Sequence, residues 1–173
     1  MSQLLETTAN NSPLPNVGLE KILHPVSSEI EILESQIISD IKTDIPLLNN
    51  VNEYIISSGG KRLRPTLVLL GAEMFEGINE QVIQAAKVIE YLHTATLLHD
   101  DVVDGAETRR SKQAAYRIWG NEASVLSGDY LFAMAFYLLT KMRNKEVLSL
   151  MSETTTRMAR GELSQLTSSF GES

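Results

Sequence analysis

The chain has no cysteine among its 173 residues. This absence excludes disulfide-stapled scaffolds, thiol catalysis and zinc–thiolate sites. Basic residues are scarce too, because 15 Lys and Arg stand against 22 Asp and Glu and give a net charge of −7. Without an excess of positive charge to neutralise phosphates, nucleic-acid binding is disfavoured as the main activity.

Long apolar runs are also lacking. The longest, residues 131–139, falls far short of the ~20 residues that a membrane-spanning helix needs. The opening residues, MSQLLE, show no basic segment followed by an apolar one, so no secretory signal is visible. We therefore expect a cytoplasmic protein with no membrane span.

The apolar residues, which belong to a hydrophobic share of 43%, recur mostly at helical spacing, and an alternation of period two is nowhere sustained. We predict an all-α chain, an antiparallel helical bundle with short loops. Residues 1–20 are rich in Ser, Thr, Asn and Pro and indicate a flexible tail before one domain, 21–173. No closing element follows the last helix, so we expect a bundle that is incomplete at its C-terminus. The expected helices span residues 26–41, 46–58, 66–75, 80–103, 121–142 and 144–165.

Acidic residues close the helix expected over 80–103. At about 100° per residue, His93, Asp100 and Asp104 project within about 40° of one another, whereas Asp101 points about 100° away from Asp100. Two carboxylates four residues apart repel, and the negative end of the helix dipole disfavours both. A hard divalent cation reverses both effects, and carboxylate oxygens suit Mg²⁺. The alternative interpretation is a solvated acidic helix end.

Cations gather in two places despite the negative net charge. Lys61, Arg62 and Arg64 lie between the Gly59-Gly60 turn and the start of a helix, where backbone N–H groups favour anions. A pair of arginines, at 109 and 110, follows the acidic segment, and guanidinium groups bind phosphate oxygens as bidentate forks. Clustered cations beside paired carboxylates are what a magnesium–diphosphate substrate requires. The alternative interpretation is that both clusters are solvated surface loops.

Together these segments resemble the trans-isoprenyl diphosphate synthases, also called polyprenyl synthetases. The resemblance covers residues 25–170 and is greatest for the longer-chain members, which make octaprenyl-type diphosphates for quinone side chains. The matching segments are GGKRLRP at 59–65, EYLHTA at 90–95, DDVVD at 100–104, RR at 109–110, GDY at 128–130 and GELSQ at 161–165.

The resemblance implies an isoprenoid synthase fold, with residues 21–173 as the N-terminal part of one synthase domain, and a homodimer. It implies condensation of isopentenyl diphosphate with an allylic diphosphate into all-trans polyprenyl diphosphates. The allylic C–O bond ionises, the isopentenyl double bond attacks the cation, and a proton is lost. By position, Asp100 and Asp104 would bind Mg²⁺, Arg109 would contact the allylic diphosphate, and Lys61, Arg64, His93 and Arg110 would bind the diphosphate of isopentenyl diphosphate.

Product length is a further implication of the resemblance. In this family, bulky residues four and five positions before the first aspartate block the growing chain. Those positions hold Thr96 and Ala95, which are small and suggest an open tunnel and a product longer than farnesyl. The alternative is that both serve only helix–helix packing.

Other side chains are expected to be structural. We expect His24 on the surface, His99 as a histidine bonded between helices, and Asp129 with a buried partner near the basic cluster. The side chains expected in the core are Leu97, Leu98, Phe132 and Phe136.

The sequence departs from the family after Asp129, where no second aspartate-rich motif follows. Half of the expected metal site is therefore missing, and three hypotheses remain. The chain is the N-terminal part of a synthase, a truncated or non-catalytic subunit that binds diphosphates and pairs with a catalytic chain, or a terpene cyclase. The two basic clusters disfavour the cyclase, since it has no isopentenyl diphosphate to hold. A second aspartate motif encoded beyond Ser173 would favour the enzyme over the subunit.

Overall fold

The computed structural model describes residues 19–171, and the side chains of residues 21–168. Within that range it confirms the all-α class, because helices carry the chain apart from one short hairpin. The expected tail at 1–20 lies outside the described residues except for Leu19 and Glu20, which belong to the first helix. The elements are α1 (Leu19–Leu23), η1 (His24–Val26), α2 (Ser27–Asp40), α3 (Pro46–Ser57), α4 (Leu63–Glu73), α5 (Glu80–Val103), β1 (Thr108–Arg109), β2 (Lys112–Gln113), α6 (Ala115–Trp119), α7 (Asn121–Met142) and α8 (Lys145–Gly171).

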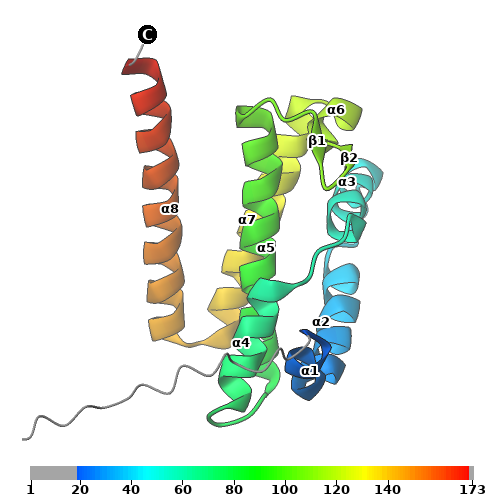
Figure 1. The fold of residues 1–173 in the computed structure, drawn as a ribbon, viewed down its shortest axis with the longest axis vertical. Helices are drawn as coiled ribbons and strands as arrows, with labels where there is room; N and C mark the ends of the chain where they lie inside the picture. The colour runs from blue at the N-terminus through cyan, green and yellow to red at the C-terminus, as the bar shows by residue number, and fades with distance from the viewer. Residues whose placement is uncertain (1–18, 172–173) are drawn as a thin grey trace, which may run out of the picture.

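The antiparallel pair of α5 and α7 forms the centre of the bundle (Figure 1). The side chain of Asn79 starts α5 by accepting a hydrogen bond from the Val82 N–H at 3.1 Å. Apolar side chains then recur at helical spacing on the facing sides of the two helices, and each large one contributes roughly 1.5–3 kcal/mol by its burial. The fully buried members include Tyr91, Ala95, Leu98, Leu131, Ala135 and Leu139.

The remaining helices cover this pair unevenly. Helix α4 packs on α5 and buries Leu69, and α2 and α3 add Leu33, Ile37 and Val51 to the core. Helix α8 stands apart from α5 over most of its length (Figure 1). Most of its described side chains are exposed, among them those of Leu150 and Leu163. Asn144 starts α8, since its side-chain oxygen accepts from the N–H groups of Glu146 and Val147.

The predicted boundaries are confirmed for α5 and α7, and to within one residue for α3. The expected start of α4 at residue 66 is wrong, because Arg62 is the residue before the helix and α4 begins at Leu63. Pro65 lies in the first turn, where its missing N–H costs nothing. The expected end of the last helix at residue 165 is also wrong, since α8 continues to Gly171.

A hairpin and a short helix replace the polar connection expected after residue 104. Strands β1 and β2 are antiparallel, and Arg110 and Ser111 form the two-residue turn with φ values of 51° and 65°. Two successive positive φ values make this a type I′ turn, which favours Asn and Gly. Arg-Ser carries no such signal. The Tyr54 hydroxyl of α3 fixes the hairpin by donating to the Gln113 carbonyl at 2.8 Å.

Helix α7 is long and apolar enough to cross a membrane by length and composition, with a mean hydropathy of 1.3 in its most apolar window. A core helix has the same composition. Since α7 packs along α5 through buried side chains, this packing accounts for part of its apolar character.

Candidate functional site

Four of the predicted site residues meet around one cavity of about 270 Å³. It lies between the loop before α4, the middle of α5 and the tip of the hairpin, and we call it the cationic cavity. The four residues that the resemblance assigned to one diphosphate all line it: Lys61, Arg64, His93 and Arg110. Gly60, Arg62, Leu63 and Glu90 complete the lining.

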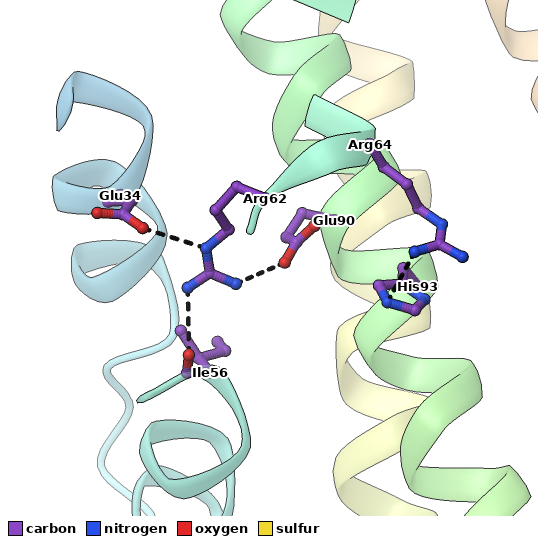
Figure 2. Close-up of polar contacts among 6 residues, drawn as sticks. All are labelled: Glu34, Ile56, Arg62, Arg64, Glu90 and His93. Carbon is purple, nitrogen blue, oxygen red and sulfur yellow. Dashed lines mark hydrogen bonds and ion pairs between the residues drawn. The ribbon is translucent and has the colours of Figure 1, made fainter. Parts of the chain in front are cut away.

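His93 is neutral in this cavity. The Arg64 guanidinium donates to His93 Nε2 across 3.0 Å, so the imidazole must accept at that nitrogen (Figure 2). Burial and the positive charge of Arg64 lower the pKa of His93, against a smaller opposing effect of Glu90. A neutral imidazole can orient Arg64 without adding to the repulsion among the cations.

Gly60 is required by the close approach of Arg110. A Cβ atom at Gly60 would lie 2.7 Å from Arg110 Nη1. The guanidinium is the flexible end of a side chain and would move aside, but it would then leave its place in the cationic cavity. The glycine pair therefore brings the backbone close to the hairpin, and so lets Arg110 join residues of α4 and α5.

The predicted metal-binding aspartates lie at the end of α5. Asp104 follows the last helical residue, is exposed, and donates its N–H to the Asp100 carbonyl at 2.8 Å, which keeps the two residues one turn apart. Burial raises the pKa of Asp100, and the negative charges of Glu162 on α8 and of Asp104 raise it further. We call these three carboxylates the acidic face.

The acidic face is an incomplete metal site. Within the described range, no group of three or more His, Asp or Glu side chains is arranged to hold a metal ion. Proteins commonly bind Mg²⁺ through one or two carboxylates together with substrate phosphates and water. Asp100 and Asp104 fit that mode, because their mutual repulsion and the raised pKa of Asp100 are the costs that a divalent cation removes.

Asp101 and Arg109 depart from the expected arrangement. Asp101 is fully buried, and its Oδ1 accepts from Arg109 Nε at 2.7 Å and from Nη2 at 2.6 Å. The guanidinium assigned to the allylic diphosphate is therefore held by Asp101 in this structure. Spacing put Asp101 on a different side of the helix from Asp100, which is confirmed, but it gave no sign that this side meets the hairpin.

An apolar groove of about 340 Å³ runs between α5 and α8 and is continuous with the acidic face. Thr96 lines it together with Leu92, Val103, Phe132 and Met158, and Asp100 and Glu162 stand at its acidic side. Ala95 does not face it, because Ala95 is fully buried. The expectation that both small residues form the tunnel is thus corrected for Ala95, whose position on α5 turns it into the core.

Two of the side chains expected in the core are only partly buried and line cavities. Phe132 lines the groove between α5 and α8, and Leu97 lines a neighbouring cavity on the same side of α5. Leu98 is fully buried as predicted, and Phe136 is partly buried against the core.

His99 bonds α5 to α7, as predicted. Its Nε2 donates to the Val125 carbonyl at 3.1 Å and lies 3.3 Å from Asp129 Oδ1. The imidazole also packs so closely on Gly128 that a Cβ atom there would collide with it. The side chain of Asp129 is 62% exposed and contacts His99, so its expected buried partner near the basic cluster is wrong. His24 is exposed, as predicted.

Sequence reasoning missed two carboxylates of the site, Glu90 and Glu162. Glu90 lies one helical turn before His93 and lines the cationic cavity. The periodicity of α5 could have found it, since residues three apart share a helix face. Glu162 lies far along the chain, and only the packing of α8 brings it near Asp100.

Comparison with known proteins finds a family whose members match most of this chain. The family model for polyprenyl synthetase matches residues 45–173. The octaprenyl diphosphate synthase of Escherichia coli is 39% identical over 150 residues, which cover 87% of this chain and 46% of that protein. The all-trans-nonaprenyl-diphosphate synthase (geranyl-diphosphate specific) of Rhodobacter capsulatus is also 39% identical, with 85% and 46% covered.

Solved structures agree with these relatives. The decaprenyl diphosphate synthase of Rhodobacter capsulatus superposes with a TM-score of 0.82 at 36% identity, over 86% of this chain and 46% of that one. A polyprenyl synthase of Caulobacter crescentus, complexed with calcium and isoprenyl diphosphate, gives 0.80 at 36% identity, over 86% and 45%. The chain thus spans just under half the length of the relatives that it matches, and it belongs to the polyprenyl synthetase family.

Proposed function

We propose that this chain is the N-terminal part of a trans-polyprenyl diphosphate synthase of the longer-chain class. It would carry the isopentenyl diphosphate site and half of the metal site. The observation that carries the proposal is the meeting of Lys61, Arg64, His93 and Arg110 around one cavity, although the chain is acidic overall. The octaprenyl and nonaprenyl synthases among the relatives support the longer-chain class.

Each region would have its own part in the condensation. The cationic cavity would bind the diphosphate of isopentenyl diphosphate, with Arg64 and Arg110 as bidentate donors. Asp100 and Asp104 would hold Mg²⁺ against the diphosphate of the allylic substrate. When bound, Mg²⁺ supplies electrostatic stabilisation to the departing pyrophosphate. Arg109 would reach the same diphosphate on leaving Asp101.

The groove between α5 and α8 would take the growing prenyl chain. Leu92, Val103, Phe132, Met158 and Leu163 form the apolar part of its lining, which would keep water from the allylic carbocation. Thr96 is the small side chain that leaves the groove open on α5.

The decisive experiment uses radiolabelled isopentenyl diphosphate, farnesyl diphosphate and Mg²⁺ with the full-length protein. We expect all-trans products longer than farnesyl, and none after a chelator removes Mg²⁺. Absence of both condensation and isopentenyl diphosphate binding would contradict the proposal.

A second candidate is a non-catalytic or truncated subunit that binds diphosphates and pairs with a catalytic chain. It is favoured by the incomplete metal site among the described residues. Binding of isopentenyl diphosphate without condensation, restored by adding a catalytic partner, would support this candidate over the first.

Assembly and location belong to the same proposal. We propose a homodimer, because the family resemblance implies the dimer, and a location in the cytoplasm. Light scattering of the purified protein would test the dimer, and a monomer at micromolar concentration would contradict it.

A further inference from the structure

Arg62 is the one cation of the GGKRLRP segment to which the proposed function gives no role. Its side chain is only 12% exposed, and all three guanidinium nitrogens are used. Nε donates to Glu34 at 3.2 Å, Nη1 to Glu90 at 2.5 Å, and Nη2 to the Ile56 carbonyl at 3.1 Å. A single side chain therefore joins α2, the end of α3 and α5 to the loop before α4.

Arg62 and Arg64 point in different directions. Figure 2 shows the Arg62 guanidinium between Glu34 and Glu90, whereas Arg64 turns to His93. The backbone of Arg62 is left-handed, with φ 44°. That conformation is strained for a residue with a Cβ, and the three hydrogen bonds of the guanidinium offset the strain.

Glu90 makes the role of Arg62 more than structural. Its side chain is only 7% exposed, and it lines the cationic cavity among the residues proposed to bind a diphosphate. An unpaired carboxylate in this place would repel the substrate, and a buried charge without a partner is costly in itself. The ion pair with Arg62 cancels this charge.

We propose that Arg62 is a positioning residue of the cationic cavity, which neutralises Glu90 and holds the loop so that Lys61 and Arg64 face isopentenyl diphosphate. The inference rests on the proposed function of the cavity. Arg62 acts on the substrate through its neighbours, because its guanidinium is directed at Glu34, Glu90 and the Ile56 carbonyl. Loss of the Arg62 side chain would weaken substrate binding because it would leave the charge of Glu90 unpaired.

The test measures the affinity of the full-length protein for isopentenyl diphosphate by calorimetry. Arg62→Gln should weaken binding by at least about 30-fold, the lower end for truncating one partner of a buried charge pair. The double variant R62Q/E90Q should return to within about fivefold of wild type, because it leaves no unpaired carboxylate. The matched double variant R62Q/E34Q should stay as weak as R62Q, since the side chain of Glu34 is 46% exposed and lines a different cavity.

Two further variants keep the test decisive if Arg62→Gln does not fold. Arg62→Lys retains the charge and should bind within about tenfold of wild type. Glu90→Gln in the presence of Arg62 should weaken binding less than Arg62→Gln does, because it leaves no unpaired carboxylate in the cavity. Unchanged affinity in a folded R62Q, or no recovery in R62Q/E90Q, would overturn the inference. Failure of the wild type to bind isopentenyl diphosphate would instead overturn the proposed function.

Discussion

The cationic cavity and the acidic face lie on the same helix and are built to different degrees. The cavity takes cations from residues 61–64 and from the hairpin, and α5 adds Glu90 and His93 to its lining. The acidic face has two carboxylates from one helix end and a third, Glu162, from a helix that stands apart. The cationic cavity thus joins several segments of the chain, whereas the acidic face lies mainly at the end of one helix.

The two regions also differ in which charges of the chain surround them. In the cavity, Glu90 offsets one of the four cations and the neutral His93 adds no charge, so the lining keeps a net positive charge. At the acidic face, repulsion raises the pKa of Asp100 and no cation of the described residues forms an ion pair with Asp100 or Asp104. The face needs an added cation, whereas the cavity needs only its anion.

The largest effect is expected from the acidic face. Asp104→Ala in the full-length protein should lower kcat about 10³-fold, because it removes a ligand of an ion that stabilises several kcal/mol of developing charge. Helicity should be unchanged, since Asp104 is exposed and lies beyond the end of α5. Product formation and far-UV circular dichroism check the two statements, and a variant that keeps most of its activity would contradict the metal assignment.

The cationic cavity should respond in affinity, not in turnover. Arg64→Gln should raise KM for isopentenyl diphosphate about 10- to 100-fold, the worth of charge-assisted hydrogen bonds to a phosphate. KM for the allylic substrate should stay within about twofold. Arg117→Gln, at an exposed arginine of α6, controls for the lost positive charge and should bind like wild type.

A pair of substitutions separates the groove from the core. Thr96→Phe should shorten the product, because the ring would fill the groove between α5 and α8. Ala95→Phe should instead lower the free energy of unfolding by about 1–3 kcal/mol through overpacking, since Ala95 is fully buried. Chromatography of the products and urea unfolding measure the two effects, and an unchanged product from T96F would remove Thr96 from the tunnel.

The smallest effect is expected on the pH dependence of stability, through the protonation of His93. The folded state holds the pKa of His93 below its ordinary value of 6.5, so the unfolded chain binds the proton more readily. Stability should therefore be full above pH 6.5 and decline as the pH falls through the lowered pKa of the folded state. Urea unfolding at several pH values should show a shallower decline in His93→Gln. An identical profile would mean that His93 does not sense Arg64.

Much of the fold could be predicted because residues next to the ends of the long helices mark where these helices begin and end. Asn79 and Gly105 delimit α5, and its apolar spacing decides which face is buried. The four cavity cations could be named because they sit in short dense motifs. Neither inference needed knowledge of distant contacts.

The remainder depends on contacts between segments that are far apart in sequence. Nothing near Asp101 shows that it will hold Arg109, and nothing near Arg62 shows that it will pair with Glu90. The hairpin was missed because Arg110 and Ser111 adopt a turn that their residue types disfavour. In each case, tertiary packing overrides the local signal.

The two-residue turn of the hairpin also sets which arginine serves which region. Arg109 ends β1 and reaches back to Asp101 at the end of α5, while Arg110, the next residue, enters the cationic cavity. The two side chains part because Arg109 is in the extended strand, whereas Arg110 is in the left-handed turn that follows it. Inserting one residue before Arg109 would move both arginines out of these positions, so the length of this loop is as much a part of the chemistry as the charges it carries.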